Sequence, residues 1–175
     1  MLSLSVNMKK TADFHEIQRF AQEVSADVMV GFLAGKKHVE TLHKDEKGKN
    51  GKYRDIDGSA PSFEEIENAE LAKMLSFGAP HIPPRPFLED GILSKKDEIL
   101  KTIGEEMDAV KQGRAANWNK VGVMAVGAVQ EFVRGDYYKS NSPNAPRTIK
   151  YKGSDTPLID GADLINSVEF VVEKL

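Results

Sequence analysis

Eight residues between Ala79 and Pro86, with the sequence APHIPPRP, constrain the fold of this chain more than any other segment. Four of the eight are proline, which has no backbone N–H and fixes its own φ angle. Each proline also restricts the residue before it to extended conformations. The segment can therefore be neither a regular helix nor a central strand. We expect a stiff extended connector.

Helical patterns flank this connector on both sides. Before it, a capping-box pattern predicts a short helix over residues 62–77. After it, apolar residues at spacings of three and four predict a helix over residues 94–113, with Ser94 as its N-cap, and another over residues 118–133. A further amphipathic helix is expected over residues 11–24, where Thr11 can act as the N-cap.

Two short segments predict strands. Residues 27–33 read DVMVGFL, a nearly continuous apolar run of strand length. Near the C-terminus, Val168, Phe170 and Val172 alternate with other residues, which is typical of a half-buried strand. Because helices and strands are mixed without a βαβ rhythm, we expect an α+β fold in which a small, mostly antiparallel sheet packs with several helices.

The whole chain, residues 1–175, is predicted to be a single domain. Its length, its 40% hydrophobic content and its 29% charged content are ordinary for one globular unit. One part departs from this composition, because residues 35–60 are rich in charge and glycine and predict a long, variable polar loop or hairpin. Its few apolar residues, which include Val39, Leu42 and Tyr53, are candidate contact points for a partner.

Charge and composition exclude several classes of protein. The 24 Lys and Arg against 27 Asp and Glu give a net charge of -3, which argues against a globally basic nucleic-acid-binding protein. The sequence has no cysteine, so disulfides, thiolate metal sites and a cysteine nucleophile are excluded. The longest apolar-looking run, residues 121–129, is about half of the roughly 20 residues that a membrane-spanning helix needs. The lysines near the N-terminus follow its apolar residues, the reverse of a secretory signal, so we expect no export by that route.

Motifs for catalysis are incomplete in this sequence. The segment 31–36, GFLAGK, is one residue short of a phosphate-binding loop, and Lys37 stands where that loop needs Ser or Thr. His38 and His43 lie near acidic residues, but their spacing of five matches neither helical spacing that places two metal ligands on one face. We therefore expect no enzymatic activity, no cofactor and no metal site.

Two charged clusters are predicted to be solvated surface. Glu105 and Glu106 are neighbours on a predicted helix, where adjacent side chains point apart, so an acidic face is expected rather than a catalytic pair. Arg147, Lys150 and Lys152 lie near tyrosines, a combination that can hold single-stranded nucleic acid, but acidic residues flank them.

Two blocks of sequence carry a resemblance to a known family. Residues 75–88, LSFGAPHIPPRPFL, resemble the EFG and IPxRPF(L/M) segment of small tailed-bacteriophage proteins described as neck, tail-completion or virion-morphogenesis proteins. Residues 143–169, which contain KGSDTPLID, are similar to the C-terminal segment of that family. The order and separation of the blocks also agree. Ser76 departs from the family's Glu, and Gly161-Ala162 replaces its Thr-Gly.

The resemblance implies a structural virion protein of the head-tail junction. Such a protein forms a homo-oligomeric ring that joins the tail to the head connector, contacts the neighbouring connector and tail-tube or tail-terminator proteins, and lets DNA pass without sequence-specific binding. Its place is the virion, after synthesis in the host cytoplasm. Two alternatives stay open: a nucleic-acid-binding accessory protein, and a metal-dependent enzyme that uses His38 and His43.

The residues that we expect at an oligomer or partner interface belong to the two blocks and to the polar excursion. The proline-rich strut is expected to lie at or near a subunit boundary, with Arg85 free to bind a carboxylate or backbone carbonyls and Phe87 as an anchor. We expect an Arg85→Ala chain to fold and to assemble poorly. The full set is Pro83, Pro84, Arg85, Phe87, Lys152, Asp155, Leu158, Val39, Leu42 and Tyr53.

Overall fold

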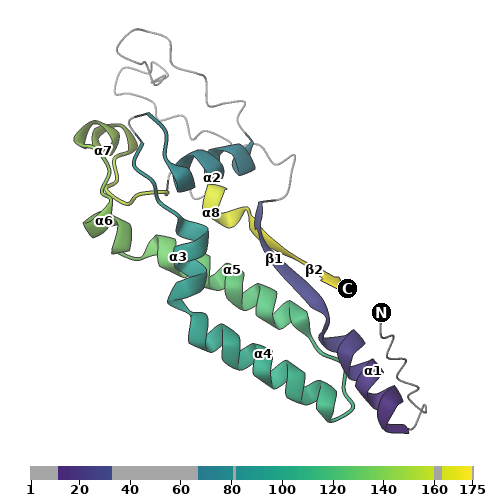
Figure 1. Cartoon of the computed structure of the whole chain (residues 1–175). Helices are drawn as coiled ribbons and strands as arrows, with labels where there is room; N and C mark the ends of the chain where they lie inside the picture. The colour runs from purple at the N-terminus through teal and green to yellow at the C-terminus, as the bar shows by residue number, and fades with distance from the viewer. Residues whose placement is uncertain (1–11, 33–66, 81, 160–162, 175) are drawn as a thin grey trace, which may run out of the picture.

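The computed structural model describes residues 12–32, 67–80, 82–159 and 163–174 (Figure 1). Within these residues the fold is α+β, as expected: eight helices pack with a two-stranded antiparallel sheet. The elements in chain order are α1 (Ala12–Val24), β1 (Ala26–Phe32), α2 (Asn68–Phe77), α3 (Phe87–Ser94), α4 (Lys96–Lys111), α5 (Trp118–Arg134), α6 (Tyr137–Asn141), α7 (Pro146–Lys152), α8 (Asp163–Asn166) and β2 (Val168–Lys174).

The sheet consists of β1 and β2, which pair in antiparallel register along their whole length. Both predicted strands are confirmed, and β2 continues to Lys174. Alternate residues of each strand, such as Val28 and Val172, pack against the helices. On the other side of the sheet, Met29 and Val171 lie opposite each other and are 47% and 37% exposed. One side of the sheet is therefore packed and the other is accessible.

Helix α5 is the centre of the molecule, because it contacts α3, α4 and both strands (Figure 1). Its buried residues include Trp118, Val121, Ala125, Val129 and Val133. Gly122 lets a neighbouring element approach closely, because a Cβ built there would collide with the ring of Phe170 in β2. The absence of a side chain at Gly122 allows the sheet to lie directly on α5.

The proline-rich segment is a turn followed by an irregular connector. Helix α2 ends at Gly78, whose φ of 81° is in the left-handed region that glycine adopts readily. Ala79 and Ile82 then exchange backbone hydrogen bonds of 3.1 and 2.8 Å. Residues 83–86 have no regular secondary structure. The predicted connector is confirmed for these four residues, whereas the first half of the segment turns back on itself.

Helix α3 differs from the sequence prediction, because residues 87–94 form a helix that the periodicity did not indicate. Ser94 is its last residue, and the Ser94 hydroxyl donates to the carbonyl oxygen of Gly91 at 2.6 Å. The prediction that Ser94 caps the next helix is therefore wrong. Lys95 separates α3 from α4, which begins at Lys96.

Candidate functional site

The two sequence blocks meet at Arg85, and this junction is the candidate site. The Arg85 side chain is only 5% exposed. Its Nε donates to the carbonyl oxygen of Ser142 at 3.0 Å, and its terminal nitrogen donates to that of Pro143 at 3.2 Å. The backbone N–H of Arg85 also donates to the carbonyl oxygen of Leu75 at 2.8 Å. One buried guanidinium thus joins the first block to the start of the second.

A buried tyrosine and a carboxylate lie beside this arginine. The Tyr138 hydroxyl donates to Asp90 Oδ2 at 2.6 Å, and Tyr138 is only 4% exposed. Burial, together with the hydrogen bond to Asp90, raises the pKa of Tyr138 well above its ordinary value. Burial also lowers the pKa of Arg85, but arginine starts so high that it remains charged at neutral pH. Tyr138 therefore acts here as a neutral hydrogen-bond donor that ties α6 to α3.

The turn after α7 is held by contacts within the chain. Lys152 Nζ donates to the carbonyl oxygen of Thr156 at 2.9 Å. The carboxylate of Asp155 lies 3.6 Å from Lys139 Nζ. Pro157 is fully buried, and Leu158 adopts a φ of 62°, which is unusual for a residue other than glycine. These bonds and the buried proline stabilise the turn.

The structure changes the expected role of two interface candidates. Arg85 and Phe87, which we expected at or near a subunit boundary, are instead buried inside the chain, with Phe87 0% exposed. The physical reason is that the carbonyls which Arg85 could bind are supplied by this chain's own segment after α6. The prolines before them are exposed. The other candidates, Val39, Leu42 and Tyr53, and both histidines of the metal hypothesis, His38 and His43, lie outside the described residues.

We expect Arg85→Ala to lower the free energy of unfolding by about 2 kcal/mol, because it removes a buried guanidinium together with its two hydrogen bonds to backbone carbonyl oxygens. The earlier expectation, that this variant folds normally and only assembles poorly, is replaced. Arg114→Ala is a matched control, since Arg114 is exposed and its side chain donates to the nearby Gln112 Oε1. Urea unfolding of the two variants measures the difference. Equal stabilities would contradict the structural role of Arg85.

A second buried charge, Glu106 of α4, lies beside the start of α5. Its carboxylate accepts from the backbone N–H of Asn117 at 2.8 Å and from Lys120 Nζ at 2.6 Å. The prediction of a solvated acidic face holds for Glu105, which is exposed, and is wrong for Glu106, which is 4% exposed. The spacing of residues in the sequence gave no signal for the burial of Glu106, because its partners Asn117 and Lys120 are 11 and 14 residues away.

The Glu106 contacts predict how stability changes with pH. The hydrogen bonds from Lys120 and then from Asn117 lower the pKa of Glu106 from its ordinary value of 4.5. Because the pKa of Glu106 is lower in the folded chain than in the unfolded chain, its ionised carboxylate stabilises the fold at pH values above the unfolded pKa. This stabilisation is lost as the pH falls below about 4.5. Glu106→Gln is expected to cost about 1 kcal/mol at pH 7 and to weaken this pH dependence. Glu105→Gln is the control, and equal acid-unfolding curves for both variants would contradict the role of Glu106.

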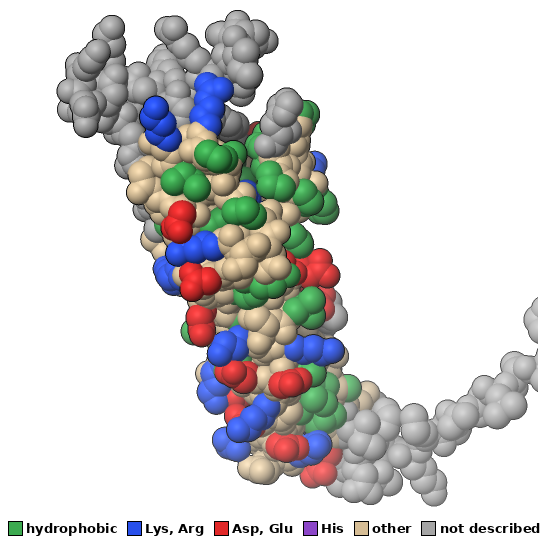
Figure 2. Space-filling view, turned by 90° about the vertical axis from the view of Figure 1, so that its left-hand side faces the viewer, with side chains coloured by type: hydrophobic (Ala, Val, Ile, Leu, Met, Phe, Trp, Pro, Cys, Tyr) green, Lys and Arg blue, Asp and Glu red, His purple; other side chains and the backbone are tan. Residues whose placement is uncertain are grey.

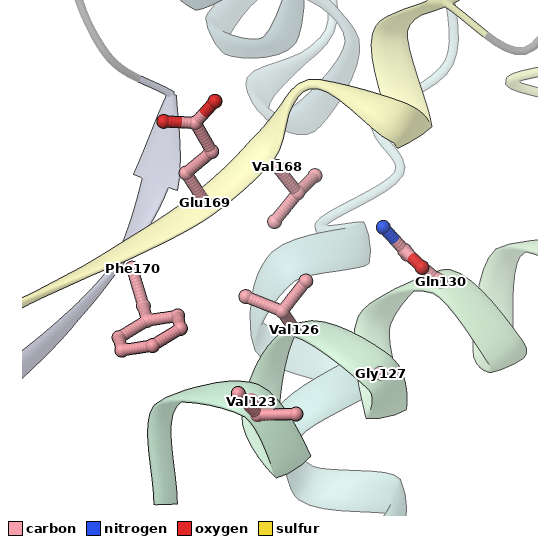
Figure 3. A pocket seen from close by; sticks show the side chains of 7 residues that line it. All are labelled: Val123, Val126, Gly127, Gln130, Val168, Glu169 and Phe170. Atoms are coloured by element: carbon pink, nitrogen blue, oxygen red, sulfur yellow. The ribbon is translucent and has the colours of Figure 1, made fainter. Parts of the chain in front are cut away.

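An open groove runs between α5 and β2 (Figure 3). Its volume is about 480 Å³. Its lining residues are Val123, Val126, Gly127, Gln130, Val168, Glu169 and Phe170. The sequence carries no signal for this groove, because the groove depends on how two segments about 40 residues apart are placed.

The described residues carry no arrangement suited to metal chemistry: within them, no group of three or more His, Cys, Asp or Glu side chains could hold an ion. None of the described helices is long and apolar enough to cross a membrane. Comparison with family models, with characterised proteins and with solved structures gives no significant match to this chain.

Proposed function

We propose that this chain is a structural protein of a tailed-bacteriophage virion, located at the junction of head and tail. In this proposal copies of the chain form a ring, which joins the tail to the head connector and through which DNA passes. The proposal rests on the resemblance of residues 75–88 and 143–169 to the neck and tail-completion family.

The observation that supports it most is that the two blocks form one structural unit. Arg85 of the first block binds the carbonyls of Ser142 and Pro143, where the second block begins. Phe87 and Leu88 of the first block pack in one core cluster with residues of the second, among them Leu164 and Val168. Residues that are far apart in sequence thus serve a common scaffold, as expected if both blocks mark one fold.

The distribution of charge is compatible with the passage of DNA. A strongly basic channel would bind the phosphate backbone and release many counterions, and so would retain the DNA. This chain has a net charge of -3. On the face shown in Figure 2, Lys and Arg side chains are interspersed with Asp and Glu rather than gathered in one extended patch.

Native mass spectrometry of the full chain over a range of concentrations tests the ring. We expect one closed oligomer of fixed mass. A chain that stays monomeric at every concentration, or that forms an open-ended series of masses, would contradict the proposal. A salt-dependent mobility shift with DNA would support the nucleic-acid-binding alternative, and metal-dependent turnover lost on substitution of His38 or His43 would support the enzyme alternative.

A further inference from the structure

The groove beside β2 has the properties of a site for an added strand. Within the described residues, β2 pairs only with β1, so the other edge of β2 has no strand partner there. Backbone N–H and C=O groups along such an edge can bind a further strand. In Figure 3 the groove lies between β2 and α5, and no residue of β1 lines it.

The floor of the groove is apolar and accessible. Val123 of α5 is 63% exposed, and Val126 beside it is half-buried. A Cβ built on Gly127 would have no atom within 4 Å, so space is open at that position. A strand on this edge of β2 would therefore bury its apolar side chains on α5.

The sequence contains a segment with the pattern that this groove requires. Residues 2–8 read LSLSVNM, in which Leu, Leu, Val and Met alternate with Ser, Ser and Asn. A strand with this alternation has one apolar and one polar face. Lys9 and Lys10 follow directly, and β2 carries the exposed Glu173, so the charges are complementary.

We propose that residues 2–8 of one copy add as a strand to the outer edge of β2 in a neighbouring copy, with Leu4 and Val6 in the groove. The proposal rests on the ring in the proposed function and names a contact that builds it. The lining residues 123–130 of α5 extend over about 10 Å, at 1.5 Å per residue. Side chains on one face of a strand are about 7 Å apart, so the groove accommodates two of them.

The position of α1 makes the neighbouring copy the acceptor. Trp118, the first residue of α5, donates from its Nε1 to the backbone carbonyl oxygen of Glu23, near the end of α1. Arg19, one turn earlier, reaches the carbonyl oxygens of Val110 and Gly113 at the end of α4. Helix α1 thus leads away from the middle of α5, where the groove lies (Figure 1).

The reach of the chain agrees with this assignment. Helix α1 extends about 18 Å from Val24 back to Ala12. The groove lies on the other side of Val24, several residues along the strands, so it is farther from Ala12 than the length of α1. The four residue steps from Ala12 to Met8 cover at most about 14 Å. Residues 2–8 therefore cannot lie along the groove of their own copy over their whole length.

Pairs of matched variants of the full chain test this contact. Leu4→Asp with Val6→Asp places charges on the apolar face of the segment, and Ser3→Asp with Ser5→Asp places the same charges on its polar face. Val123→Glu blocks the groove at an exposed position, where folding is not at risk. By native mass spectrometry we expect the first pair and Val123→Glu to convert the oligomer to monomer, whereas the Ser variants keep it.

Mixing the two monomeric proteins gives the sharpest result. The variant with Leu4→Asp and Val6→Asp keeps an intact groove, and the Val123→Glu variant keeps an intact segment 2–8. The mixture is therefore expected to form a heterodimer, in which the segment of the second protein occupies the groove of the first. An oligomer that survives the Leu4/Val6 substitutions, or a mixture without heterodimer, would overturn this inference and leave the ring itself standing. A wild-type chain that is always monomeric would contradict both proposals.

Discussion

Replacement of Phe87 by alanine is expected to destabilise the chain by about 3 to 5 kcal/mol, the typical cost of removing a fully buried phenylalanine side chain. Phe87 is 0% exposed. Its ring meets that of Phe32 edge-on, with 6.2 Å between centroids. It also packs in the core cluster that contains Val129 and Ile165. The loss is comparable to the whole stability of many single domains.

Phe77→Ala is the matched control, because the same change is made at a side chain that is 80% exposed. Its effect should stay within about 0.5 kcal/mol. Trp118, the single tryptophan, is buried and reports unfolding in urea by its fluorescence. Similar midpoints for both variants would show that Phe87 does not anchor the core.

The two strands could be predicted from the sequence because their own residues carry the signal. Val168, Phe170 and Val172 alternate with period two, and the same alternation places them against α5 in the structure. The long helices are predictable for the same reason, since their apolar residues recur at helical spacing. The sequence also marked Phe87 as an anchoring side chain through its place after the prolines, but the structure places it in the chain's own core and not at a subunit boundary.

The contacts of the candidate site could not be predicted in the same way. Arg85 binds carbonyls that are 57 and 58 residues further along the chain. Tyr138 and Asp90 are 48 residues apart. Any carbonyl or carboxylate can fill these roles, so no residue type identifies the partner in advance. Only the packing of α3 on α5 brings these groups together.

Helix α3 was missed because its sequence, FLEDGILS, is short and has a glycine in the middle. Glycine disfavours a helix by about 1 kcal/mol relative to alanine when nothing else compensates. In the structure Gly91 is buried and faces α5, where a Cβ built on it would lie 2.6 Å from the Cα of Val129. The residue that weakens the helix locally is the one that lets it pack closely on its neighbour.

Gly91→Val should therefore destabilise the chain by about 3 kcal/mol, since forcing extra atoms into a packed contact typically costs up to about that amount and sometimes more. The atom in the way belongs to the backbone of Val129, so no side-chain rotation can relieve the clash. Helices α3 and α5 would have to separate, and the Tyr138–Asp90 hydrogen bond between α6 and α3 would be strained with them.

The control for this change is Gly104→Val in α4, where a Cβ has no atom within 4 Å. Valine has a better helix propensity than glycine, so this variant should be as stable as the parent chain or slightly more stable. Urea unfolding of both variants separates a steric effect from a general effect of glycine replacement. A Gly91→Val chain as stable as Gly104→Val would mean that α3 and α5 do not touch at this glycine, and the route by which α3 positions Asp90 beside Tyr138 would have to be sought elsewhere.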